Sequence, residues 1–156
     1  MSSEVDKRLA QLGIALPAPG APGGNYVPFV IAGDLVFMAG QLARTEGRIV
    51  YAGKVGSDLS VEQGQAAARL CALNLLAQLK VACDGNLDRV ARCVRLGGYV
   101  NCGPDFKEQP KVVNGASDLM IEVFGERGKH ARTAIGATLP SDSAVEVEAI
   151  FQLSRT

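Results

Sequence analysis

Apolar residues recur at helical spacing in three stretches of the chain. In the strongest stretch, Ser60 and Gln63 form the Ser-x-x-Gln pattern of a capping box at a helix start. A second helix is expected from about Pro110 to Gly125, and a short one over residues 3–12. After Ser60, the apolar positions fall three and four residues apart and predict one buried helix face: Ala68, Cys71, Ala72, Leu75, Leu76, Leu79 and Cys83.

Runs of β-branched and apolar residues outside these helices predict strands. Residues 26–32 and 35–39 are separated by Gly33-Asp34, which is the kind of two-residue turn that joins a hairpin. Gly97-Gly98 interrupts a later run and indicates a bulge or the close approach of another backbone. The remaining strands are expected over residues 48–52, 88–101, 131–138 and 144–153.

The predicted order of elements is β-β-β-α-β-α-β-β after an N-terminal helix. Helices with one apolar stripe pack on one face of a sheet. The pattern therefore predicts an α+β fold: a mixed sheet of the six-stranded type with two long helices on one face and an N-terminal helix as an extension. Residues 1–24 form the helix and a Pro/Gly-rich arm, and residues 25–156 form a single domain.

The last predicted strand has apolar residues on both of its faces. Ile150 falls on the same face as Glu146 and Glu148, which is the face away from the helices. An apolar residue on an uncovered sheet face favours contact with a partner subunit.

Composition narrows the class of protein. The 156 residues suffice for about one domain, and 47% hydrophobic and 21% charged residues are typical of a globular chain. Lys plus Arg and Asp plus Glu number 16 each, whereas nucleic-acid and membrane-surface proteins carry a basic excess. No apolar run approaches the ~18 residues of a membrane span, and the charged N-terminus does not resemble a secretion signal. These features predict a cytoplasmic protein and argue against membrane and nucleic-acid partners.

Metal and cofactor chemistry finds little support in the sequence. The only histidine, His130, is far along the chain from every cysteine, and no two cysteines form a CxxC pair. We interpret the cysteines as small buried residues and His130 as a surface or capping residue, with a Cys–His nucleophile pair as the alternative. No metal is expected, and no cofactor is expected because the usual phosphate-loop and dinucleotide motifs are missing.

The candidate site lies near the C-terminal end. Arg132 begins a run of otherwise small and apolar residues, where a guanidinium can line a pocket and offer a planar fork to a carboxylate. A solvent-exposed arginine on an edge strand fits the same pattern. Glu146 and Glu148 fit the polar face of an alternating strand. On the pattern alone, the solvent-exposed interpretations are the simpler ones.

Several separated segments resemble the reactive intermediate deaminase family, also called the RidA or YjgF family. No single segment is specific, but their order and spacing together are. The longer N-terminus and the sequence from Asn114 to Leu119 resemble a long-chain subgroup of the family. The similar segments span nearly everything after residue 25: Tyr26-Val-Pro, Gly33 to Gln41, Asn74-Leu-Leu-Ala, Asn114, Arg132, Leu139-Pro140 and Val145 to Ala149.

This resemblance implies a YjgF-like, chorismate mutase-like fold and a homotrimer with clefts between subunits. Family members hydrolyse reactive enamine and imine acids, such as 2-aminoacrylate, to 2-oxo acids and ammonia. By position, Arg132 would clamp the substrate carboxylate and Glu146 would hold or activate the attacking water. The resemblance also implies substrate-binding positions at Tyr26, Gly40, Asn114 and Ala134. An imine carbon is already electrophilic, so neither a metal nor a covalent nucleophile is required.

Two departures and two rival functions stay open. Ala39 and Ala134 stand where many family members have Ser and Cys, which leaves the substrate undetermined. A non-catalytic trimer that binds a small carboxylate metabolite would also need Arg132. An RNA-cleaving protein is the third candidate, but the balanced charge and few aromatic residues argue against it.

The last two strands set a geometric condition on the site. If they form a simple hairpin, Arg132 and Glu146 lie roughly 17 Å apart at ~3.4 Å per residue. One small imino acid could not touch both. Either the connection is not a simple hairpin, or each pocket takes groups from two chains.

Overall fold

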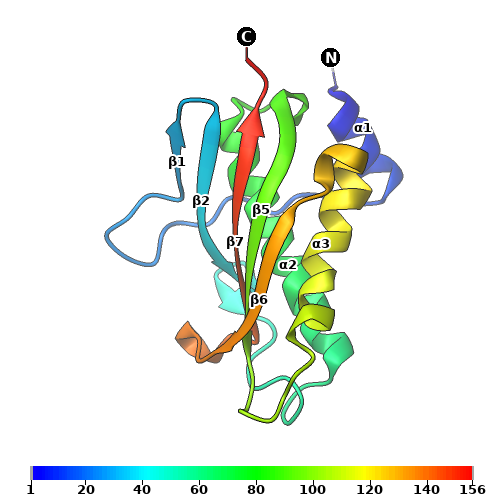
Figure 1. The fold of residues 1–156 in the computed structure, drawn as a ribbon. Coiled ribbons are helices and arrows are strands. Elements are labelled where there is room, and N and C mark those ends of the chain that lie inside the picture. Colours follow the sequence, from blue (N-terminus) through cyan, green and yellow to red (C-terminus); the bar gives the residue numbers. More distant parts are fainter. Residues whose placement is uncertain (1, 156) are drawn as a thin grey trace.

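A layer of helices covers one face of a five-stranded sheet in the computed structural model, which describes residues 2–155 (Figure 1). The strands lie in the spatial order β1-β2-β7-β5-β6. Only β5 and β6 run parallel, so the sheet is mixed. The α+β fold class is confirmed. The main elements are α1 (Glu4–Gln11), β1 (Phe29–Ala32), β2 (Leu35–Leu42), α2 (Val61–Ala82), β5 (Val90–Asn101), α3 (Gln109–Phe124), β6 (Ala131–Ala137) and β7 (Val145–Leu153).

Helix α2 forms where the capping box and the apolar pattern predicted a helix. The Ser60 side chain accepts a hydrogen bond from the Gln63 amide at 3.1 Å, and the Gln63 side chain accepts one from the Ser60 amide at 2.9 Å. The predicted capping box is therefore confirmed. The predicted apolar face is completely buried against the sheet and α3. Each large side chain buried in this layer contributes about 1.5–3 kcal/mol to folding.

Gly98 lets α3 pack closely on the sheet. A Cβ atom at Gly98 would lie 2.5 Å from both γ carbons of Val113, so no larger residue fits without displacing the helix. The glycine pair therefore makes room for side chains, Val113 at Gly98 and Glu148 at Gly97, rather than for the predicted approach of another backbone. The bulges of β5 lie earlier in the strand, between Val90 and Arg92 and between Cys93 and Arg95.

The strand predicted over residues 48–52 does not join the sheet. Only β4 (Arg48–Ile49) forms there, and it pairs with β3 (Arg44–Thr45) in a separate two-stranded hairpin. Gly47 turns the chain sharply with a φ of 78°, and Gly53, with a φ of 117°, turns it again before a longer strand can form. The main sheet of the described residues therefore has five strands rather than six.

The last two strands do not form a simple hairpin. Strand β5 lies between β6 and β7, and Leu96 pairs with Arg132 on one side and with Ala149 on the other. The connection passes through the short 3-10 turn η3 (Pro140–Asp142) and is long enough to cross one strand. Non-local pairing of this kind leaves no periodic signal in the connecting residues.

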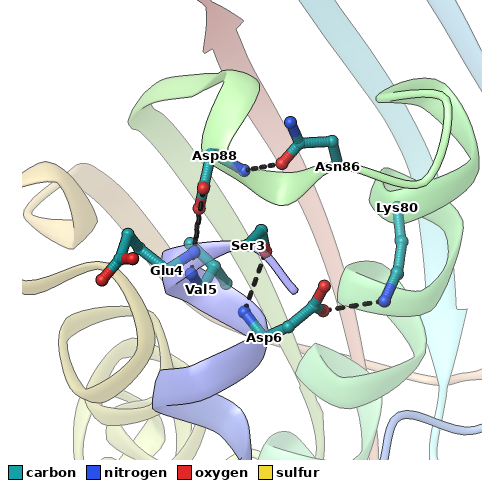
Figure 2. A network of polar contacts seen from close by, with 7 residues as sticks. All are labelled: Ser3, Glu4, Val5, Asp6, Lys80, Asn86 and Asp88. Carbon is teal, nitrogen blue, oxygen red and sulfur yellow. Dashed lines mark hydrogen bonds and ion pairs between the residues drawn. The ribbon is translucent and has the colours of Figure 1, made fainter. Parts of the chain in front are cut away.

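The predicted N-terminal helix is confirmed as α1, and a polar network fastens it (Figure 2). The carboxylate of Asp88 accepts hydrogen bonds from the first two backbone amides of α1, Glu4 and Val5, both at 2.9 Å. Lys80 of α2 forms an ion pair with Asp6 at 2.8 Å. A carboxylate at a helix N-terminus satisfies amides that lack an intrahelical partner. Asp88, in the turn η1 (Leu87–Arg89), therefore caps α1 from outside the helix.

Candidate functional site

Arg132 lies on the edge strand β6 with its side chain held against α3. It shares the helix-covered face of the sheet with its register partner Leu96, which is fully buried. Its Nη1 donates to Asn114 Oδ1 at 2.7 Å and to Ser117 Oγ at 3.1 Å. Its Nη2 donates to the Pro110 carbonyl at 3.1 Å. Arg132 thus lies on an edge strand and is partly exposed, as the simpler interpretation expected, but three hydrogen bonds to α3 hold its side chain in place.

The guanidinium keeps donors available for a ligand. A guanidinium carries five N–H donors, and α3 accepts from three of those of Arg132. The Nε–H and the second Nη2 hydrogen have no acceptor among residues 2–155. Two donors on a partly exposed arginine are what a carboxylate requires for a two-point contact.

Ser117 and His130 continue the hydrogen-bonded network that begins at the Arg132 guanidinium. Ser117 Oγ lies 2.9 Å from His130 Nε2, and His130 Nδ1 lies 2.6 Å from the Gly128 carbonyl oxygen. Because a carbonyl only accepts, Nδ1 must carry the hydrogen, and in the neutral ring Nε2 accepts from the Ser117 hydroxyl. His130 caps the end of the 3-10 helix Gly125–Gly128 through this carbonyl, as the capping interpretation expected, and it is also part of the Arg132 cluster.

Ser117 is a residue that sequence reasoning missed. It lies three residues after Asn114, so both occupy the same face of α3, and only 8% of Ser117 is exposed. A polar residue inside the apolar stripe of a helix is the signal that could have found it. We call Asn114, Ser117, His130 and Arg132 the arginine cluster.

Glu146 lies on the other face of the sheet. Its neighbours in β7, Val145 and Val147, are fully buried under the helices, so Glu146 points to the face without helices. Burial raises the pKa of the Glu146 carboxyl, and the negative charge of Glu148 raises it further. Within residues 2–155, no side-chain donor or cation pairs with the Glu146 carboxylate.

Gly40 makes room for this carboxylate. Any Cβ atom at Gly40 would collide with the Glu146 side chain. Ala134 lies elsewhere, two residues after Arg132 and therefore on the arginine-cluster face of β6, partly buried against the core. The structure thus separates the predicted positions into one group around Arg132 and another around Glu146.

Glu148 differs from Glu146 although both point from the same strand face. The Tyr99 hydroxyl donates to Glu148 Oε1 at 2.8 Å, and Arg95 Nη1 lies 3.6 Å from the same oxygen. That hydrogen bond to Glu148 is the main reason why the pKa of Tyr99 is raised. Glu148 therefore has a local partner and a local cation, whereas Glu146 has neither among the described residues.

Tyr26 lies far from Arg132 within one chain. It is 52% exposed and precedes β1, at the sheet edge opposite to β6. Its hydroxyl accepts a hydrogen bond from the Gly23 amide, inside the Pro/Gly-rich arm. Four strand spacings of ~4.8 Å put β1 and β6 roughly 19 Å apart.

Arg132 and Glu146 likewise do not converge in one chain. Tyr99 of β5 pairs with both Glu146 and Ile135, which places Arg132 two strands away and three residues along from Glu146. At ~4.8 Å per strand and ~3.4 Å per residue, their Cα atoms are about 14 Å apart. The two side chains also leave opposite faces of the sheet. A ligand held by Arg132 of one chain cannot touch Glu146 of that chain.

Two of the buried thiols are held in the neutral form, and the described residues contain no cluster of metal ligands. Burial raises the pKa of Cys83 to about 11 and that of Cys93 to about 12, so neither thiol ionises near neutral pH. The hydrogen bonds of His130 go to Ser117 and Gly128 rather than to a cysteine. Among residues 2–155, no three His, Cys, Asp or Glu side chains gather as a metal site would require. No helix there has the length and hydropathy to cross a membrane.

Comparisons with solved structures agree with this fold. The structure of Atu1372 from Agrobacterium tumefaciens is 44% identical, with a TM-score of 0.90, and the match covers 96% of this chain and 92% of that one. A Shewanella oneidensis MR-1 structure described as a "putative endoribonuclease" is 39% identical, with a TM-score of 0.92 and 96% and 99% coverage. Escherichia coli TdcF, solved with bound serine, shares the fold at 24% identity and a TM-score of 0.60, over 90% of this chain and 96% of TdcF.

Sequence comparison gives the same result over almost the whole chain. Protein TCP17 of Trypanosoma cruzi is 48% identical over 155 residues, which cover 98% of this chain and 96% of the relative. A family described as "YjgF/chorismate mutase-like, putative endoribonuclease" matches residues 6–151. The resemblance that rests on the separated segments is therefore confirmed: this chain belongs to the YjgF/chorismate mutase-like family.

Proposed function

We propose that this protein hydrolyses small reactive imino acids, such as the tautomers of 2-aminoacrylate, to 2-oxo acids and ammonia. The observation that carries the proposal is the Arg132 guanidinium, which three acceptors of α3 hold in place while two N–H donors have no acceptor among residues 2–155. A two-point contact of this kind fixes a carboxylate and the bond next to it. The substrate class is accordingly a small carboxylic acid with its reactive carbon beside the carboxylate.

Glu146 is suited to the water-activating step. Its half-buried carboxylate is free of local partners, and its raised pKa makes it a better base than an ordinary glutamate. With the substrate in its protonated iminium form, Glu146 takes a proton from water as the oxygen attacks the carbon, and the C=N electron pair moves to nitrogen, which becomes a neutral amine. The same carboxyl returns this proton to the amine. The C–N bond then breaks and ammonia leaves, while the hydroxyl gives its proton back to the Glu146 carboxylate as the C=O bond forms. General acid–base catalysis of this type contributes about 10²–10⁴-fold.

The two groups meet only if a second chain supplies one of them, so we propose a homotrimer with shared sites. The helix-free face carries exposed apolar side chains, and Val30 and Phe37 pair across β1 and β2 in the same row as Ile150 of β7. Ile135 of β6 is exposed on that face too. A row of this kind favours packing against another copy. Light scattering should then give three times the 16.3 kDa of one chain.

A coupled assay tests the activity. A dehydratase acting on serine or threonine generates the 2-amino-acrylate or 2-aminocrotonate species in place, and semicarbazide trapping reports the imine that remains. We expect the protein to accelerate imine loss and ammonia release, and we expect Arg132→Ala and Glu146→Gln to reduce this acceleration strongly. Arg48→Ala is a matched control, because Arg48 is exposed on the small β3-β4 hairpin. No acceleration at any protein concentration contradicts the proposal.

The alternative is a non-catalytic trimer that binds a small carboxylate metabolite. It is favoured by the fact that the arginine cluster is complete within one chain, whereas Glu146 stands apart from it. Calorimetric titration with serine, the ligand bound in the TdcF crystal, separates the two functions. Binding that Arg132→Ala removes, in a protein that leaves imine loss unchanged, would establish the binder and overturn the deaminase.

A further inference from the structure

We propose that Ser117 and His130 are positioning residues that set the orientation of the Arg132 guanidinium before a ligand arrives. The hydrogen-bonded chain runs from the Gly128 carbonyl through the His130 ring and the Ser117 hydroxyl to Nη1 of Arg132. This inference rests on the proposed role of Arg132 as the clamp for a carboxylate.

With a neutral imidazole ring, each hydrogen in this chain has one direction. His130 Nδ1 donates to Gly128 O over 2.6 Å, which leaves Nε2 as the acceptor for the Ser117 hydroxyl at 2.9 Å. The Ser117 oxygen then presents its lone pairs to Arg132 Nη1 at 3.1 Å. A serine within a helix commonly bonds back to its own helix backbone. Here the imidazole takes that hydrogen and so turns the oxygen towards the guanidinium.

The far end of the chain is anchored to α3 itself. Gly128 closes the short turn η2 (Gly125–Gly128), and a Cβ atom at Gly128 would collide with the backbone carbonyl of Met120 in α3. The turn is therefore pressed against the helix, which fixes the position of the carbonyl that receives the His130 hydrogen. His130 and Arg132 are two residues apart and lie on one face as the chain enters β6. Helix, turn and strand are thus tied together beneath the clamp.

Loss of the chain should weaken the grip on the substrate without impairing the chemistry. Without the Ser117 oxygen, one Nη1 hydrogen loses its acceptor, and Asn114 and the Pro110 carbonyl alone hold the guanidinium. The carboxylate contact exists in both the bound substrate and the transition state, so the effect falls on KM rather than on kcat. A hydrogen bond to a charged group at this position supports about a tenfold rise in KM for Ser117→Ala.

An NMR experiment on the ligand-free protein measures directly whether the rotation of the Arg132 guanidinium is restricted. Nitrogen-15 NMR resolves the Nη groups of an arginine whose rotation is restricted, and Arg132→Lys identifies the signals of Arg132. We expect separate Nη1 and Nη2 signals in the parent and in His130→Gln, whose amide oxygen can still accept from Ser117. In Ser117→Ala and His130→Leu these signals should merge and exchange faster with water. Unchanged Arg132 signals in both variants would overturn the inference.

The kinetic arm adds a readout that a purely structural role would not produce. With unfolding midpoints checked by circular dichroism, Ser117→Ala and His130→Leu should raise KM about tenfold with kcat within about twofold, and His130→Gln should restore the parent KM. A fall in kcat at constant KM contradicts the positioning role. If the parent protein neither binds serine nor hydrolyses imines, the proposed function fails, and the NMR comparison still decides whether Ser117 and His130 orient Arg132.

Discussion

The two sides of the sheet hold their charged groups in opposite ways. On the helix-covered side, three acceptors of a single helix of the same chain fix Arg132. On the helix-free side, Glu146 has no such partner within residues 2–155, and burial raises the pKa of its carboxyl. The hydrogen bonds that hold Arg132 are therefore complete when one chain has folded. Glu146 stands on the sheet face that carries exposed apolar side chains, and this difference between the two regions supports the proposal of a site shared between chains.

The largest effect is expected from removing the clamp. Arg132→Ala deletes a charge-assisted, two-point contact with the substrate, which should cost about 2–4 kcal/mol in binding and lower kcat/KM by about 30- to 10³-fold. The fold should persist, because Arg132 lies on an edge strand and is partly exposed. Calorimetry with serine and the coupled imine assay measure both quantities.

Arg132→Lys tests whether the positive charge alone or the planar shape of the guanidinium is required for binding. A lysine keeps the charge but presents a single point instead of a planar fork, so it should recover little. A Lys variant that binds as well as the parent would show that Arg132 does not act as a two-point clamp. Arg48→Ala should match the parent throughout, since that residue is exposed on the β3-β4 hairpin.

Mixing two inactive proteins tests whether the separated regions meet across chains. Arg132→Ala and Glu146→Ala trimers each lack one half of every site. After random subunit exchange at equal amounts, about a quarter of the shared sites should combine an intact Arg132 with an intact Glu146. We therefore expect activity to return to about a quarter of the parent value. Persistent inactivity after mass spectrometry has shown mixed trimers would place both groups of a site on one chain.

A substitution at Gly40 is expected to disturb Glu146 and to leave the arginine cluster unchanged. The methyl group of Gly40→Ala collides with the Glu146 carboxylate and should displace it, while the arginine cluster stays untouched on the opposite face. A displaced base slows the chemistry, so kcat should fall about tenfold or more with little change in KM, the reverse of the pattern expected for Ser117→Ala. Steady-state kinetics of the two variants side by side measure this. A rise in KM alone for Gly40→Ala contradicts the assignment of Glu146 as the base.

Patterns that span only a few residues were enough to predict much of the fold, but they were not enough to predict how the site is assembled. The capping box at Ser60 and the stripe behind it predicted α2 because both act within a few residues. The insertion of β5 between β6 and β7 is a pairing of distant segments, and a strand pattern does not record its neighbours. The same limit applied to Ser117 and His130, which lie 13 residues apart and come together only after η2 folds back on α3.

The smallest expected effect concerns the charge beside the base. Glu148 contributes to the raised pKa of Glu146, although burial is the larger cause. Glu148→Gln keeps an acceptor for the Tyr99 hydroxyl but removes the negative charge, so the Glu146 pKa should fall towards its ordinary value of 4.5. Because the base works only when ionised, kcat/KM should rise with pH through the Glu146 pKa, and its acid limb should move to lower pH in the variant.

Stability should change with pH in the matching sense. A raised pKa means that the folded chain binds more protons than the unfolded chain between pH 4.5 and the higher folded pKa, so this group's contribution to stability falls as pH rises through that window. Glu146→Gln removes this loss, and its unfolding midpoint should exceed that of the parent near neutral pH by a margin that shrinks towards pH 4.5. Denaturant titrations at several pH values measure it. An acid limb that stays in place in Glu148→Gln, together with a pH-independent margin for Glu146→Gln, would mean that Glu146 is an ordinary surface carboxylate and that the contrast with Arg132 does not hold.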